Sequence, residues 1–138
     1  MRKMGIDYGE VRIGVAFSDL LGIIASGYET YVRKDLPTDL QHFKDLVVSQ
    51  QVDKIIMGLP LNMDGTEGDR AIATREFGNQ LISAIGGNID IEYLDERLTS
   101  VTAEEILIEA GVRREKRKEV IDKLSATLIL QDYLDRKK

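Results

Sequence analysis

Two segments of the sequence contain acidic and polar residues of the kinds that hold metal ions and phosphates. In segment 7–14 (Asp-Tyr-Gly-Glu-Val-Arg-Ile-Gly), Asp7 ends an apolar run, Gly9 permits a tight turn, and Arg12 follows as a candidate contact for nucleic acid. Segment 58–66 (Gly-Leu-Pro-Leu-Asn-Met-Asp-Gly-Thr) lies between an apolar run and a helical pattern. Asn62, Thr66 and the backbone amide of residue 65 are therefore candidate phosphate contacts at the start of a helix.

Two further acidic segments follow. Segment 93–100 brings Asp95 and Glu96 to the end of a predicted strand, with Arg97 next as a counter-ion or a bidentate phosphate ligand. Because side chains alternate across a sheet, one acid of the pair is expected to face the site, and alternation alone leaves the choice open. Segment 122–130 places Asp122 on one helical face with Ser125 and Ala126, which are small enough to let that face pack closely on a sheet.

Each segment also has a purely structural interpretation. Asp7 is a common residue in a hairpin turn, and the Asp-Gly pair at 64–65 forms turns equally well. Asp95 and Glu96 can cap a helix, and Asp122 can be an acid in the first turn of a helix, where the dipole favours it.

The composition restricts the kind of site that the acids can form. The chain has 138 residues with no cysteine and one histidine, His42, which we interpret as a structural residue of an amphipathic helix. A metal site must then consist of oxygen ligands, which favours Mg²⁺ or Mn²⁺. The absence of cysteine, of an apparent signal peptide and of a long apolar stretch leads us to expect a cytoplasmic protein without membrane spans.

Charge is unevenly distributed. The net charge is −5, which argues against a nucleic-acid partner on average, but a basic run lies late in the sequence. We expect Arg113, Arg114 and Arg117 of this run to contact nucleic acid, and carboxylates at a metal site would be offset by bound cations.

Hydrophobic patterning predicts one domain, residues 1–138, with nine elements. The expected strands are 3–8, 11–18, 26–33, 53–58 and 88–94, and the expected helices are 37–51, 68–85, 99–110 and 120–134. Three early strands should pair antiparallel, and two later ones should arrive through helical crossovers. The prediction is an α/β fold, a ribonuclease-H-like mixed five-stranded sheet flanked by helices.

In that layout the acids Asp7, Asp95, Glu96 and Asp122 converge. Several carboxylates in one place repel each other unless a cation joins them. Two metal ions about 4 Å apart activate water, orient a phosphate and stabilise the leaving oxygen, so these acids are the predicted catalytic residues of a metal-dependent nuclease.

All four segments, in this order, resemble the bacterial YqgF/RuvX family over residues 4–134. The resemblance implies a fold related to Holliday-junction resolvases, with metal ligands at Asp7, at an acid of the Asp95/Glu96 pair (Glu96 is our choice) and at Asp122. It also implies hydrolysis of nucleic acid, either in maturing the 5′ end of precursor 16S rRNA or in resolving branched DNA.

Three alternatives stay open at this point. The protein can be a nuclease for RNA or DNA, or a nucleic-acid-binding module without catalysis that uses the basic run. A sugar-kinase or actin-like ATPase also opens with an Asp-x-Gly hairpin, but needs two such domains. We expect a monomer or weak homodimer, because no long exposed apolar stripe announces a stable interface.

Overall fold

A mixed five-stranded sheet forms the centre of the protein. The computed structural model describes residues 1–96 and 99–137, without the side chains of 99–101 and 119. Strands β1 (Arg2–Asp7), β2 (Arg12–Ser18) and β3 (Ala25–Val32) pair antiparallel, whereas β4 (Val52–Leu59) lies parallel to β1 and β5 (Asp90–Asp95) lies parallel to β4. The strand order is β3-β2-β1-β4-β5, so β1 is central and the C-terminal ends of β1, β4 and β5 lie at one edge.

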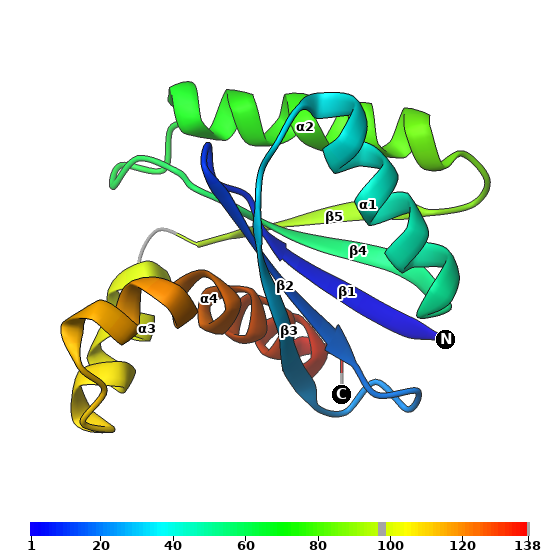
Figure 1. Ribbon diagram of the computed structural model, residues 1–138. Coiled ribbons are helices and arrows are strands. Elements are labelled where there is room, and N and C mark those ends of the chain that lie inside the picture. The colour runs from blue at the N-terminus through cyan, green and yellow to red at the C-terminus, as the bar shows by residue number, and fades with distance from the viewer. Residues whose placement is uncertain (97–98, 138) are drawn as a thin grey trace.

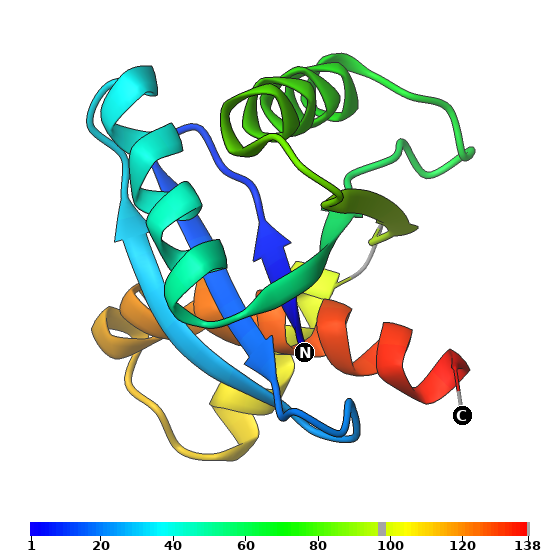
Figure 2. The same ribbon diagram turned by 90° about the vertical axis from the view of Figure 1, so that its right-hand side faces the viewer.

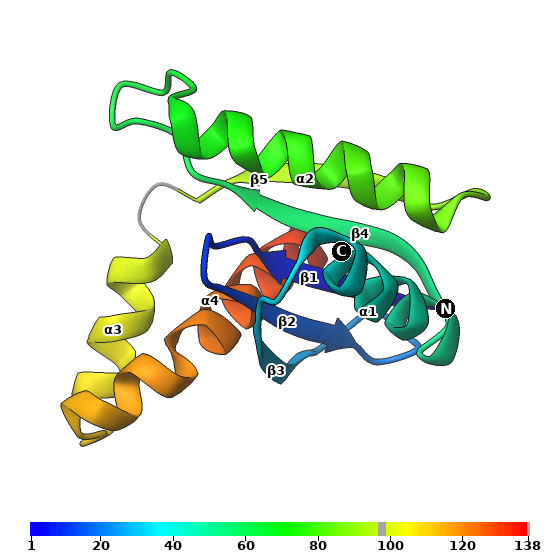
Figure 3. The same cartoon turned by 45° about the horizontal axis from the view of Figure 1, so that its top comes forward.

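Helices cover both faces of this sheet. Helices α1 (Leu36–Ser49) and α2 (Asp69–Ile85) lie on one face, and α4 (Arg114–Arg136) crosses the other (Figures 1 and 2). Helix α3 (Thr99–Glu109) packs on α4, and together they extend beyond the sheet as a helical hairpin (Figure 3). None of the described helices is both long and apolar enough to cross a bilayer.

Alternation along the strands determines which face each side chain occupies. Met4 and Ile6 of β1 are fully buried in the larger core under α1 and α2. Gly5 faces the other way, and a Cβ built there would lie 2.9 Å from the carbonyl oxygen of Ala126 in α4. Asp7 has the same parity as Gly5, so its side chain points to the α4 face.

The order of the nine predicted elements and the mixed sheet were predicted correctly, and His42 stacks on Tyr31. The predicted start of the last helix was wrong, because α4 begins at Arg114 and not at residue 120. Residues 114–118 are good helix formers without glycine or proline. They lack the apolar periodicity used for the prediction because this end of the helix lies outside the main core.

Candidate metal centre

Two carboxyl groups meet at the edge of the sheet. Asp7 ends β1 and is buried, and Glu96 follows β5, whose backbone pairing continues through a hydrogen bond from the Glu96 amide to the Leu59 carbonyl. The Asp7 and Glu96 side chains share a hydrogen bond. The structure thus brings together two of the predicted site residues.

Alternation in β5 explains why Glu96 takes part. Leu94 is buried in the core under α4, whereas Ile91 and Tyr93 pack toward the opposite core. Glu96 shares the parity of Leu94 and lies on the α4 face with Asp7. Asp95 has the opposite parity and is exposed, so the structure does not bring this predicted catalytic residue into the cluster.

Gly58 makes the contact between Asp7 and Glu96 possible. Strand β4 separates β1 from β5, so a side chain from β5 must cross it to reach Asp7. A Cβ at residue 58 would lie 2.4 Å from the Glu96 carboxyl carbon. The Glu96 side chain therefore passes over the bare backbone of Gly58. This role of Gly58 was not predicted from the sequence, although a glycine inside a strand is the usual signal of such a close approach.

The environment disfavours charge on both acids. Burial, then the nearby charge of Asp122, raises the pKa of Asp7 to about 7. Burial, then the charge of Asp7, raises the pKa of Glu96 to about 9. A cation between the carboxylates would remove this penalty, and carboxylate oxygens are the ligands that Mg²⁺ and Mn²⁺ prefer.

A second buried acid provides a contrast. Burial tends to raise the pKa of Asp39, but hydrogen bonds from the Lys34 amide, the Tyr31 hydroxyl and Arg33 lower it below its ordinary value. Asp39 is thus satisfied by the protein itself. Asp7 and Glu96 have each other and lack such a set of donors among the described hydrogen bonds.

Asp122 lies close enough to raise the pKa of Asp7, but its carboxylate is turned toward Arg12. Arg12 Nε donates to Asp122 Oδ2 at 3.1 Å. Among the described residues, no group of three acidic side chains is yet arranged to bind one metal ion. Asp122 lies about two turns inside α4, so its interpretation as a first-turn acid was wrong.

Arg70 belongs to the same region and was absent from the predicted site. It lies in the first turn of α2 and lowers the pKa of both Asp7 and Glu96, although burial outweighs this effect. Its position just after a glycine-containing loop, at the start of a helix, was the available signal.

The loop from β4 to α2 is held by its own hydrogen bonds. The Asn62 side chain donates to the Thr66 hydroxyl at 2.9 Å, and the Gly65 amide donates to the Asn62 carbonyl at 2.8 Å. The expectation that the Gly65 amide is available for phosphate was therefore wrong, whereas Asn62 and Thr66 remain exposed at the surface. Arg97, another predicted contact, lies outside the described residues.

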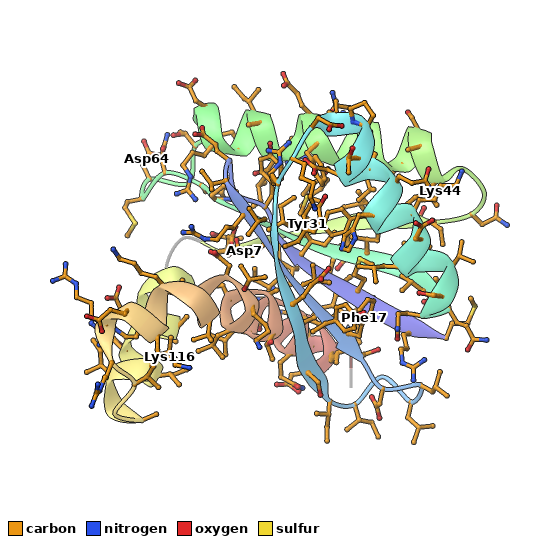
Figure 4. The ribbon with its side chains drawn as sticks, in the orientation of Figure 1. Asp7, Phe17, Tyr31, Lys44, Asp64 and Lys116 are labelled. Carbon is orange, nitrogen blue, oxygen red and sulfur yellow. The ribbon has the colours of Figure 1, made fainter. Side chains whose placement is uncertain are left out.

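The basic run of the sequence forms the start of α4. In Figure 4, Asp7 lies between the loop that carries Asp64 and the helical hairpin that carries Lys116. Arg113 and Arg114 are exposed there. Arg117 is half-buried, donates to the Val112 carbonyl and lies 3.8 Å from Glu104, so it also holds α3 against α4.

The sequence is similar to a protein family and to individual proteins over nearly its whole length. Residues 1–136 match the family model RuvX, described as Holliday junction resolvase. A protein of Syntrophomonas wolfei is 50% identical over 135 residues, covering 98% of this chain and 94% of its own length. One of Heliobacterium modesticaldum is 49% identical over 137 residues, covering 99% and 91%. Both carry the provisional name of pre-16S rRNA nuclease.

Solved structures show the same fold at low sequence identity. RuvC of Thermus thermophilus in complex with a Holliday junction substrate has a TM-score of 0.60 at 11% identity, covering 99% of this chain and 95% of that one. The fowlpox virus resolvase in complex with Holliday junction DNA has a TM-score of 0.61 at 9% identity, covering 99% of both chains. These likenesses confirm the predicted ribonuclease-H-like fold.

Proposed function

Because this chain belongs to the RuvX family of nucleases, we propose that it is a metal-dependent endonuclease of the cytoplasm that matures the 5′ end of precursor 16S rRNA. The observation that carries this proposal is the contact between Asp7, which is buried at the end of β1, and Glu96, which is partly buried just after β5. The RNA substrate comes from the names of relatives that are about half identical over nearly the whole chain.

The residues fit a divalent cation. Asp7 and Glu96 would be the first two ligands, and Asp122 would be the third once its carboxylate turned from Arg12. Mg²⁺ or Mn²⁺ bound at this position would lower the pKa of a bound water and stabilise the leaving oxygen of the phosphodiester. The protein orients its carboxylates, and burial of the site strengthens their interaction with the cation.

Purified protein should cut an RNA that carries the 5′ precursor of 16S rRNA when Mg²⁺ or Mn²⁺ is present. Asp7→Asn keeps the shape of the side chain and removes a ligand. Since even outer-shell partners of a metal contribute about 10–100-fold, the variant should lose at least about a hundredfold in rate. Cleavage at the wild-type rate by rigorously purified Asp7→Asn protein would disprove the proposed site.

A four-way DNA junction is the second candidate substrate, because the matching family model describes junction resolvases. The same experiment decides between the two substrates, with paired cuts in the junction as the signature of resolution. A junction needs two symmetric active sites, so this activity also requires a dimer. If both substrates are bound and neither is cut, the protein is a nucleic-acid-binding module.

A further inference from the structure

A cleft of about 380 Å³ opens beside the candidate metal centre. The turn between β1 and β2 forms one wall, with Val11 and Arg12, and the first turns of α2 form the other, with Arg70 and Ala73. Asp122 of α4, whose charge raises the pKa of Asp7, also lines the cleft. The cleft therefore adjoins the site and contains groups that the sites described so far do not use.

The lining combines cationic and apolar groups. Arg12 and Arg70 come from different elements, and the apolar atoms of Val11 and Ala73 lie with them in the lining. The Thr74 hydroxyl donates to the Arg70 carbonyl at 2.8 Å and is thereby occupied. Guanidinium groups bind phosphate oxygens bidentately, and apolar side chains suit the sugar of a nucleotide.

The net charge of this cleft depends on whether a cation is bound at Asp122. Arg12 and Arg70 are balanced by Asp122 and by Glu10 of the turn, so the lining as it stands has no excess charge. A cation held by Asp122 neutralises that carboxylate and leaves the cleft net positive. The cleft thus becomes attractive to an anion only when a cation is bound.

The position of Arg70 is unfavourable for the helix that carries it. It lies in the first turn of α2, at the positive end of the helix dipole, and the N-cap residue Gly68 offers no side-chain hydrogen bond. A cation in the first turn costs helix stability. Its closeness to Asp7 and Glu96, whose pKa values it lowers, and its location in the cleft lining indicate a role at the site instead.

The ion pair between Arg12 and Asp122 can be broken. Its Nε contacts only one oxygen of Asp122, and 44% of the Arg12 side chain is exposed to solvent. A divalent cation competes with Arg12 for the carboxylate and repels the guanidinium. Arg12 is then free to rotate within the cleft toward another anion.

We propose that this cleft binds the backbone phosphate next to the bond that is cut, with Arg70 and Arg12 as its two cationic groups. Arg12 moves from Asp122 to that phosphate when the divalent cation binds. The inference rests on the proposed function, because it assumes a cation at the acids and a nucleic-acid strand as substrate. Linkage then requires that cation and strand increase each other's affinity.

The first test measures binding of a short fluorescein-labelled single-stranded RNA over a range of salt concentrations, with Ca²⁺ as an oxygen-liganding cation. Arg70→Gln and Arg12→Gln should each reduce the slope of log affinity against log salt by about 0.7, the contribution of one phosphate contact in a single strand. Arg136→Gln, which removes an equal charge from the far end of α4, should leave the slope unchanged. An unchanged slope in Arg70→Gln overturns the proposal.

The second test isolates the movement of Arg12. Calorimetric titration with Mn²⁺ in the absence of RNA should show severalfold tighter binding to Arg12→Gln than to wild type, because the competitor for Asp122 is gone. Ca²⁺ should increase the affinity of wild type for the RNA more than that of Arg12→Gln. Weaker Mn²⁺ binding by Arg12→Gln, with an undiminished effect of Ca²⁺ on RNA affinity, would mean that Arg12 only positions Asp122.

The two proposals can fail separately. Salt slopes and cation linkage as expected, in a protein that cuts neither RNA nor junction, would support the cleft and disprove the nuclease. Cleavage that depends on Asp7, with slopes unchanged in both arginine variants, would support the nuclease and overturn the cleft.

Discussion

Asp7 and Glu96 oppose the stability of the fold that carries them. Asp7 is buried, Glu96 is partly buried, and the two acids lie against each other, so ionisation of both is costly without a cation. Asp39 shows that the same protein satisfies a buried acid fully where only structure is needed. This difference between Asp39 and the other two acids favours a bound cation at Asp7 and Glu96.

The pH dependence of stability should report this cost. The folded-state pKa of Asp7, about 7, and that of Glu96, about 9, lie above the ordinary values of these acids. The folded state therefore holds protons more tightly, and this contribution to stability is present below about pH 4 and is lost as pH rises toward about 9. Metal-free Asp7→Asn protein should consequently melt higher than wild type at about pH 8, and the difference should shrink toward about pH 5.

Differential scanning fluorimetry with a chelator measures this effect. A change of about 1 kcal/mol moves the Tm of a domain of this size by roughly 2–6 °C. Added Mg²⁺ should raise the Tm of wild type at about pH 8 more than that of Asp7→Asn. Parallel melting temperatures of the two proteins across the whole pH range would contradict the raised pKa of Asp7.

A comparison of neighbouring acids tests which one serves the site. Glu96→Gln should reduce the cleavage rate at least about a hundredfold and weaken Mn²⁺ binding, because it removes a ligand. Asp95→Asn, a matched change one residue away, should leave the rate within a few-fold of wild type. Equal losses in both variants would contradict the orientation that separates the two side chains.

The limit of sequence reasoning at this position was the register of one strand. Alternation predicted that Asp95 and Glu96 point to opposite faces, but which face contains the site depends on how β5 is placed beside β4. Once Leu94 is known to be buried under α4, Glu96 follows by parity. Arg70 was missed for a related reason, because its closeness to the acids depends on the placement of α2 over the sheet.

At the scale of elements, close approach between the sheet and α4 assembles the site. Gly14 permits this approach, because a Cβ there would lie 1.9 Å from the Asp122 carbonyl oxygen. The helical pattern predicted this close packing, because Ser125 and Ala126 are small residues on the same face of α4. The pattern did not predict the first turns of α4, whose basic residues carry no apolar pattern.

Gly58→Ala should separate function from folding. The new Cβ would overlap the end of the Glu96 side chain at 2.4 Å, and the flexible tips of Glu96 and Ile129 can shift to accommodate it. Overpacking of this kind costs about 1–3 kcal/mol, which we expect at the lower end here. The displaced carboxyl group leaves Asp7, so Mn²⁺ affinity and cleavage should fall far more than stability.

Urea unfolding and Mn²⁺ calorimetry on the same samples test this prediction. Gly27→Ala is the matched control, because its Cβ would meet side-chain atoms only, with Lys123 Cγ at 2.7 Å and Thr127 Oγ1 at 3.1 Å. It should keep Mn²⁺ affinity near that of wild type. Gly58→Ala protein that binds Mn²⁺ as tightly as wild type would show that Glu96 does not need to cross β4 at this point.

The whole molecule presents its charge unevenly around the site. Although the net charge is −5, the start of α4, which carries Lys116, lies on the side where β1 and β4 end (Figures 3 and 4). The basic residues there lie at the positive end of the α4 dipole, and Arg113 caps the helix without a side-chain hydrogen bond. Because helix stability does not account for such a cluster, we propose that a polyanion bound at Asp7 also reaches the helical hairpin.

Neutralising Arg113, Arg114 and Lys116 to glutamine should therefore weaken RNA binding through its salt dependence. The slope of log affinity against log salt should fall by roughly 2, at about 0.7 for each phosphate contact in a single strand. Cleavage at saturating RNA should change little, because none of the three residues belongs to the metal centre, so the apparent KM rises while kcat is kept. Lys44, Arg136 and Lys137, changed to glutamine together, provide an equal loss of charge away from the hairpin. Equal slopes in the two triple variants would mean that the strand does not contact the start of α4.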